Sequence, residues 1–229
     1  MPVSKEVQEA LDTIFAADSE LYERRGWNRR SGFGVRPVLL NIDLANAWTR
    51  PGNPFSCNDM DDQIIPGVRR LLDAARAKRV PIIYTTTAFC SEFDMGVWPL
   101  KAPFKELMLG KKAVEIDERI APVNGVDTLI VKKRASAFAG THLGGILRAA
   151  QIDTLICTGV TMAGCVRHTV EDAIGEGFRS IIVRECVGDR VPAAVEWNLF
   201  DLDMKCCDVE PLERVLAYLE RIEPLSKAD

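Results

Sequence analysis

The chain has 229 residues, of which 47% are hydrophobic and 27% are charged, as is typical of a globular protein. These proportions disfavour disordered, collagen-like and coiled-coil chains. The 29 basic and 33 acidic side chains give a net charge of −4 and form no basic stripe, so nucleic acid is not an expected partner.

The N-terminal segment has apolar residues at helical spacing from Val7 to Tyr22, which predicts a helix ahead of the glycine-containing stretch 25–34. We interpret residues 1–34 as a helical arm and residues 35–229 as a single domain. The N-terminus lacks the apolar block of a signal peptide, and no run approaches the roughly 18 to 20 apolar residues of a membrane span. We therefore expect a cytoplasmic protein without a membrane partner.

From residue 36 onward, short apolar runs alternate with amphipathic stretches. The runs predict strands at 38–43, 80–86, 128–132, 154–158 and 179–184, with a last short apolar run at 204–209. Helices are predicted at 67–78, 141–150, 164–176, 193–203 and 211–222. Because the strand runs are continuous instead of alternating, we expect strands that are buried on both faces. The pattern predicts a three-layer, doubly wound α/β fold with a mostly parallel sheet of about six strands.

The stretch 88–115 is the least regular part of the chain, and we interpret it as an insertion that forms a lid or an interface loop. Seven cysteines form an odd set without a CxxC pair, and the only histidines are His142 and His168. Zinc-site spacings are therefore absent, and reduced thiols are the better interpretation.

Ligands of open parallel sheets bind outside the carboxyl ends of the strands. In this chain the rule points to Asp43, to residues 85–88, to Lys132 and Lys133, and to the turns 159–165 and 185–190. Asp43 ends an apolar strand, and its structural alternative is a carboxylate that organises the next turn. Lys132 also ends an apolar strand, and its alternative is a solvated lysine.

Cys165 follows a strand-to-helix turn and opens the next predicted helix. Free N–H groups and the helix dipole favour a thiolate at such a position, whereas most free cysteines are simply buried. Together, Asp43, Lys132 and Cys165 supply an acid, a cation and a thiol at one edge of the sheet. A cysteine-dependent acyl-transfer site needs these three groups.

Three segments resemble the signatures of the isochorismatase-like cysteine hydrolases: NIDLANAW around Asp43, VKKRASAFAGT around Lys132 and GVTMAGCVRHTVEDA around Cys165. The similarity runs from about residue 22 to residue 210. It implies the family's fold and a catalytic triad of Asp43, Lys132 and Cys165. In the family the lysine stands four positions before the serine of the SAF motif, which selects Lys132 over Lys133.

The resemblance also implies a cis peptide bond between Val160 and Thr161 and an oxyanion site formed by the backbone N–H groups of Thr161 and Cys165. Arg190 resembles the arginine that holds the substrate carboxylate in this family; its alternative is a surface salt bridge. The family further implies a homo-oligomer, either a dimer or a tetramer, with sites near subunit interfaces.

Two departures from other members narrow the expected chemistry. Zinc-dependent members carry an Asp-x-His and a further histidine after the first catalytic aspartate, but residues 44–79 contain no histidine, so no metal or other cofactor is expected. Members that cleave vinyl ethers lack the cysteine nucleophile, so Cys165 favours cleavage of a C–N bond.

Within the family, the segments IDLANAWTRPGNPFSC, AGCVRHTVEDAIGEGFR and GDRVPAAVEWNLFD most resemble those of members that hydrolyse the terminal ureido group of the N-carbamoyl amino acid N-carbamoylsarcosine. This similarity implies sarcosine, carbon dioxide and ammonia as products and a place in creatinine degradation. Other small amides, such as maleamate or a ureidoacrylate, are an alternative within the class. A dinucleotide-dependent oxidoreductase would need G-x-G-x-x-G after the first strand, where this chain has DLANAW. A third alternative is a non-catalytic binding module, against which the retained acid, cation and thiol argue.

Overall fold

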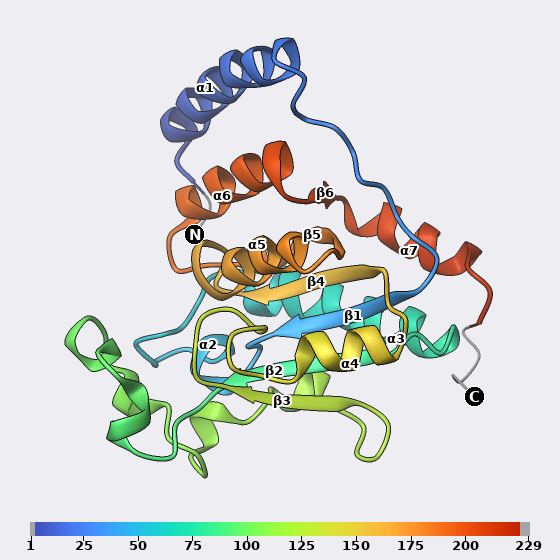
Figure 1. Ribbon diagram of the computed structural model, residues 1–229. Coiled ribbons are helices and arrows are strands. Elements are labelled where there is room, and N and C mark those ends of the chain that lie inside the picture. The colour runs from blue at the N-terminus through green and yellow to red at the C-terminus, as the bar shows by residue number, and fades with distance from the viewer. Residues whose placement is uncertain (1–2, 225–229) are drawn as a thin grey trace.

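The computed structural model describes residues 3–224, in which six strands form one sheet (Figure 1). The strand order is β3-β2-β1-β4-β5-β6, and all neighbouring strands are parallel. The strands are β1 (Pro37–Ile42), β2 (Ile82–Thr87), β3 (Thr128–Lys132), β4 (Thr154–Val160), β5 (Arg179–Gly188) and β6 (Asp208–Glu210). The predicted doubly wound α/β fold is confirmed, and the sheet is entirely parallel. Residues 1–2 and 225–229, the ends of the two segments defined from the sequence, lie outside the described residues.

Successive strand residues point to opposite faces of the sheet, so a continuous apolar run makes both faces apolar. Helices cover both of these faces. Leu39 of β1 packs with the face covered by α3 and α7, whereas Leu40 packs with the face covered by α4, α5 and α6. These helices are α3 (Ile65–Ala77), α4 (Leu143–Ala149), α5 (Arg167–Gly175), α6 (Pro192–Lys205) and α7 (Leu212–Arg221). Two apolar cores result, one on each side of the sheet.

The N-terminal helix α1 (Lys5–Arg24) lies over α6, outside the three layers (Figure 1). Ser4 caps it by accepting a hydrogen bond from the Val7 N–H at 3.4 Å. None of its residues is buried, and its main anchor is Phe15, whose ring stacks on Phe200 at 4.3 Å between centroids. The predicted N-terminal helix is therefore present, and it packs on the outer surface of α6.

One prediction about the strands is wrong. β3 is one of the two edge strands of the sheet, so its outward-facing residues Leu129 and Val131 remain 47% and 41% exposed instead of buried. A continuous apolar run does not distinguish an edge strand from a central one, because neighbouring strands determine which faces are covered.

Several elements also differ from the predictions. β5 continues to Gly188 because Val187 and Gly188 pair with the end of β4, so residues 185–188, which were expected to lie in a turn, belong to the strand. α5 begins at Arg167, because a π-helical turn, η7 (Met162–Val166), precedes it and contains Cys165. The short helix α2 (Asn46–Thr49) follows β1 and was not expected. The apolar run 204–209 is divided between the end of α6 and the three-residue strand β6.

The irregular stretch 88–115 consists of 3-10 turns that project beyond the carboxyl ends of the strands (Figure 1). These turns are η2 (Glu92–Met95), η3 (Trp98–Leu100), η4 (Phe104–Glu106) and η5 (Lys112–Val114). Two further turns, η1 (Met60–Ile64) and η6 (Glu118–Ile120), flank α3 and β3. Within residues 3–224, no helix combines the length and the hydropathy that a membrane crossing would need.

Candidate active site

Asp43 lies at the carboxyl end of β1, where the chain turns away from the sheet with a φ of 53°. Aspartate is one of the few non-glycine residues that adopt this left-handed conformation readily. Its side chain is fully buried, and both carboxylate oxygens are used. Thr85 donates to Oδ1 at 2.8 Å and Thr87 donates to Oδ2 at 2.9 Å. The two threonines of β2 therefore fix the orientation of the carboxylate.

Lys132 ends β3 and reaches across β2 to Asp43. Its Nζ lies 2.7 Å from Asp43 Oδ2, 2.8 Å from Thr87 Oγ1 and 3.0 Å from the Arg134 carbonyl oxygen. Burial favours the neutral amine, but the negative charge of Asp43 and the hydrogen bond to its carboxylate outweigh it and raise the pKa of Lys132. The side chain is therefore a buried ammonium that neutralises the Asp43 carboxylate.

Cys165 lies in the π-helical turn after β4, with its Sγ 3.3 Å from Lys132 Nζ. Burial raises the pKa of the Cys165 thiol to about 12; the Lys132 ammonium opposes this shift and the Asp43 charge adds to it. The expectation of a resting thiolate at a helix N-terminus is therefore wrong. Burial outweighs the nearby positive charge, and the residue precedes α5 instead of starting it. The resting group is a thiol beside an ion pair.

The turn that carries Cys165 also presents a free backbone donor. The peptide bond between Val160 and Thr161 is cis, at the position that the family resemblance implied. Gly164 and Val166 donate their N–H groups to the Thr161 carbonyl at 3.0 and 3.1 Å, which closes the turn. Among the described residues, none accepts a hydrogen bond from the Thr161 backbone N–H. This group is therefore able to donate to a bound oxygen.

A pocket of about 520 Å³ opens at this edge of the sheet and includes Cys165 and Thr161 in its lining. Four aromatic rings form one wall: Trp48, Phe55, Trp98 and Phe104. Phe104 stacks on Trp98 at 4.9 Å between centroids and meets Phe55 edge-on at 5.4 Å. Trp98 and Phe104 belong to the insertion 88–115. The insertion therefore forms part of the pocket wall, which gives the irregular segment a structural role.

Arg190 lines the same pocket from the turn after β5. Its guanidinium group lies 3.5 Å from the Phe55 carbonyl oxygen and 4.0 Å from an Asp189 oxygen, and the side chain remains 43% exposed. These contacts are long, so most of its donors are available to a ligand. Lys133, Arg134 and His168 also contribute to the lining. Lys133 is held by Asp94 at 2.9 Å and by the Ala88 carbonyl oxygen at 2.7 Å.

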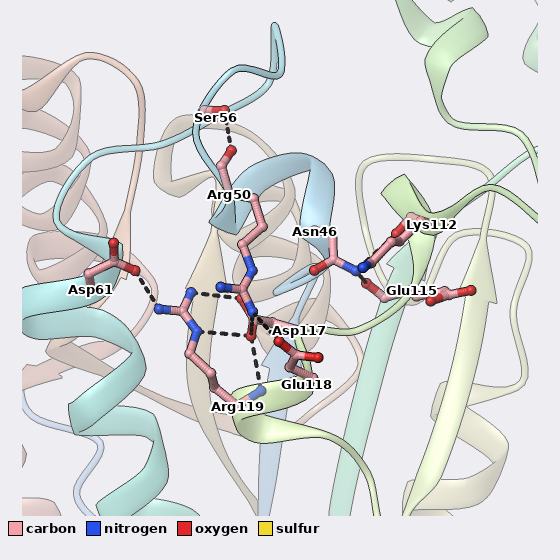
Figure 2. Close-up of polar contacts among 9 residues, drawn as sticks. All are labelled: Asn46, Arg50, Ser56, Asp61, Lys112, Glu115, Asp117, Glu118 and Arg119. Carbon is pink, nitrogen blue, oxygen red and sulfur yellow. Dashed lines mark hydrogen bonds and ion pairs between the residues drawn. The ribbon is translucent and has the colours of Figure 1, made fainter.

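The insertion is attached to the segment that follows Asp43. The Asn46 backbone N–H donates to the Glu115 carbonyl oxygen at 2.9 Å. The Asn46 side-chain amide donates to the carbonyl oxygens of Lys112 and Glu115 at 2.9 and 3.1 Å (Figure 2). Helix α2, which carries Trp48, and the end of the insertion therefore form one hydrogen-bonded unit.

Asp117, which follows the insertion in the chain, strengthens this attachment. Its buried carboxylate pairs with Arg50 at 2.9 Å and with Arg119 at 2.7 Å, and Arg119 also contacts Asp61 (Figure 2). Burial opposes ionisation, but the hydrogen bonds and the positive charge of Arg119 lower the pKa of Asp117 to about 2. The carboxylate stays charged and links the insertion to the loop that carries Phe55.

The structure brings together all of the residues singled out from the sequence: Asp43, Lys132, Cys165, Thr161 and Arg190. Sequence reasoning identified the end of β2 only as a region and missed the roles of Thr85 and Thr87, although a polar run at the end of an apolar strand is a usable signal. It also missed the aromatic wall. Within residues 3–224, no group of three or more metal-ligating side chains is assembled.

Comparison with known proteins agrees with this geometry. Residues 37–213 match the isochorismatase domain family, so the chain belongs to the isochorismatase family. It is 51% identical to N-carbamoylsarcosine amidase of an Arthrobacter species over 93% of this chain and 82% of that protein. It is 36% identical to maleamate amidohydrolase of Pseudomonas putida over 86% of this chain and 92% of that protein.

The fold agrees with a solved structure as well. A cysteine hydrolase from Pseudomonas syringae pv. phaseolicola superposes with a TM-score of 0.77 at 22% identity, covering 84% of this chain and 96% of that chain. This likeness concerns the three-layer architecture and not the substrate.

Proposed function

We propose that this protein is a cysteine-dependent amidohydrolase that cleaves the terminal ureido C–N bond of N-carbamoylsarcosine. One observation carries the proposal: the Cys165 sulfur lies 3.3 Å from the Lys132 ammonium, which is itself 2.7 Å from the Asp43 carboxylate, in a pocket that Arg190 also lines. The 51% identity to an N-carbamoylsarcosine amidase supports this choice of substrate.

In the first half of the reaction, Cys165 attacks the ureido carbonyl carbon. Because the pKa of the resting thiol is raised, the proton passes to Asp43 as the S–C bond forms. The Thr161 and Cys165 N–H groups hold the oxyanion, with the Lys132 ammonium beside the sulfur. The C–N bond then breaks, and the Asp43 proton leaves with ammonia. The product of this half is a carbamoyl thioester on Cys165.

In the second half, water attacks the thioester carbonyl and gives its proton to Asp43. The C–S bond breaks, and Asp43 returns the proton to the Cys165 sulfur. The carbamate that is released loses carbon dioxide without further catalysis and leaves sarcosine. These residues need no metal or cofactor for any of the steps. The same products imply a place in creatinine degradation.

Arg190 is the group that we assign to the substrate carboxylate. A guanidinium group binds a carboxylate through two parallel hydrogen bonds, and the long contacts of Arg190 leave its donors available. The aromatic wall of the same pocket then contacts the apolar part of the substrate. This arrangement suits a small molecule with a ureido group at one end and an anion at the other.

The experiment that tests the proposal is ammonia release from a panel of N-carbamoyl amino acids, maleamate, ureidoacrylate and nicotinamide. N-carbamoylsarcosine should have the highest kcat/KM of the panel. A clear preference for maleamate or ureidoacrylate would reassign the substrate within the family. Absence of ammonia release from every member would favour a non-catalytic binding module.

We also propose that the protein acts in the cytoplasm as a homo-oligomer, a dimer or a tetramer. The insertion supports the homo-oligomeric state, because three of its apolar side chains are exposed: Phe93 (96%), Val97 (74%) and Leu100 (83%). Large apolar side chains gathered on one segment are typical of protein interfaces. Light scattering on the purified protein would give the mass in solution, and a monomer would contradict this proposal.

A further inference from the structure

A second buried carboxylate lies in the pocket and has no part in the reaction described above. Asp189 follows β5 directly, its side chain is 6% exposed, and it lines the pocket together with Cys165 and Arg190. Its Oδ2 accepts the Ala163 N–H at 3.0 Å, and its Oδ1 accepts the Arg190 N–H at 2.7 Å. One rigid group therefore contacts two different loops, with one oxygen for each.

The two loops carry the two ends of the proposed substrate site. Ala163 belongs to the turn after β4 that holds Thr161 and Cys165, and Arg190 belongs to the turn after β5. β4 and β5 are neighbours, with Val160 paired to Gly188 at the point where both strands end. Beyond this last pair, the Asp189 carboxylate joins the turn after β4 to the turn after β5.

The Arg190 turn is supported from its other side by Asn58. The Asn58 N–H donates to the Asp189 carbonyl oxygen at 3.3 Å, and its side-chain amide donates to the Arg190 carbonyl oxygen at 2.9 Å. Meanwhile the guanidinium group of Arg190 is 4.0 Å from Asp189 Oδ1, too far for a good hydrogen bond. Asp189 therefore fixes the backbone of Arg190 and leaves its head group available to a ligand.

We propose that Asp189 is a positioning residue that sets the separation between the reacting ureido carbonyl and the substrate carboxylate. It does so by holding the oxyanion turn and the Arg190 turn with the two oxygens of one side chain. This inference rests on the proposed function of Arg190 as the carboxylate-binding group. Its consequence is that Asp189 contributes most to substrates that use both ends of the site.

The test compares N-carbamoylsarcosine with its neutral amide on wild type and Asp189→Ala. We expect Asp189→Ala to lower kcat/KM for the charged substrate about 100-fold, because misplacement of about 1 Å has effects of this size. The loss in kcat/KM for the amide should be several-fold smaller than the loss for the charged substrate. In an Arg190→Ala background this difference between the two substrates should disappear. Asp189→Asn keeps one acceptor oxygen and should lie between wild type and Asp189→Ala.

Asp208 offers a matched control. It is a buried aspartate that accepts two backbone N–H groups, those of Ser31 and Gly32 at 3.0 and 2.7 Å, but it lies at the start of β6, away from the pocket. Asp208→Ala should leave the ratio of the two kcat/KM values unchanged. If Asp189→Ala does not fold, Asn58→Ala removes support from the same turn and should reproduce the selective loss on the charged substrate.

Hydrogen exchange separates this inference from the proposed function, because it needs no substrate. The Ala163 amide should exchange at least about tenfold faster in Asp189→Ala than in wild type, and at the wild-type rate in Asp208→Ala. Lack of wild-type turnover would reject the proposed substrate, and the exchange rate would then decide the role of Asp189 alone. Equal losses on both substrates, or unchanged exchange at Ala163, would overturn the inference.

Discussion

The Lys132 ammonium lies 2.7 Å from a carboxylate oxygen of Asp43, and both side chains are completely buried. If one of the two charged groups is removed, the other stays buried and cannot be solvated by water, so the pair acts as one unit. The Cys165 thiol is the third member, because Lys132 Nζ is also 3.3 Å from its sulfur. Changes at any of the three residues are therefore expected to affect the other two.

Replacing Cys165 should abolish turnover and leave the fold intact. The side chain is small and only partly buried, so Cys165→Ala and Cys165→Ser remove the nucleophile with little loss of packing. Ammonia release measures the loss of turnover, and a thermal melt measures whether the fold is retained. Cys57→Ser is the control and should keep almost all activity, because Cys57 is a neighbour that does not line the pocket. Substantial activity in either Cys165 variant would exclude a covalent mechanism.

Lys132→Ala should lower kcat by about a hundredfold or more, the usual effect of losing one preorganised electrostatic group. It should also reduce the free energy of unfolding by roughly 3 to 5 kcal/mol, because the Asp43 charge is left buried without its partner. Kinetics and urea denaturation measure the two effects. The adjacent Lys133→Ala should be mild in both, since Lys133 binds Asp94 and the Ala88 carbonyl oxygen. A larger loss at Lys133 would show that the register of the family match is wrong.

Alkylation of Cys165 by iodoacetamide should become faster with pH throughout the range from 7 to 10. The pKa of the thiol is raised to about 12, so the thiolate fraction increases about tenfold with each pH unit below that value. Mass spectrometry of the labelled peptide measures the rate. A rate that levels off below about pH 8 would mean that the thiolate is already stable in the free protein.

Arg190→Ala should reduce kcat/KM for N-carbamoylsarcosine by about 10- to 150-fold, since charged hydrogen bonds of this kind are worth roughly 1.5 to 3 kcal/mol. The neutral amide should be little affected, because it lacks the carboxylate that Arg190 binds. Steady-state kinetics on both compounds provides the comparison. If the two substrates suffered the same loss, Arg190 would be a structural residue and the carboxylate would bind elsewhere.

A chain that begins at residue 25 should fold and keep its kcat/KM within about threefold, although it should be less stable. None of the residues of α1 is buried, and the helix lies on α6 (Figure 1). None of its residues lines the pocket. Removing it exposes Phe200, and such a lost aromatic contact costs about 1 to 3 kcal/mol. The melting temperature and ammonia release test this division of the chain. Loss of folding would show that residues 1–24 are needed for the fold.

The sequence predicts the strands and the three polar strand-end residues, because both follow from local patterns. Asp43, Lys132 and Cys165 interrupt or end apolar runs, and the rule for parallel sheets brings such ends together. The exposure of Leu129 could not be predicted, because it depends on which strand is at the edge. The π-helical turn before α5 was also missed, since five residues are too few to distinguish the spacing of a π-helical turn from that of an α-helix.

The protonation state of Cys165 shows a second limit. A helix N-terminus is one interaction that favours a thiolate, whereas the pKa of Cys165 depends on the burial of its sulfur and on all nearby charges. Burial is a property of the assembled pocket, whose lining residues come from segments far apart in the chain. The position of Asp189 between two turns is not visible in the sequence for the same reason.

The two halves of the pocket have different structural supports. The ion pair and the thiol are held at the ends of central and edge strands, while the ring of Phe104 is held by an insertion whose end is fastened through Asn46. The insertion supplies residues 98 and 102–104 to the pocket lining, and none of them belongs to the sheet. Selection, or an engineer, can therefore remodel which amide is admitted while the reacting groups stay in place, and libraries for new substrates should be concentrated on these four lining positions.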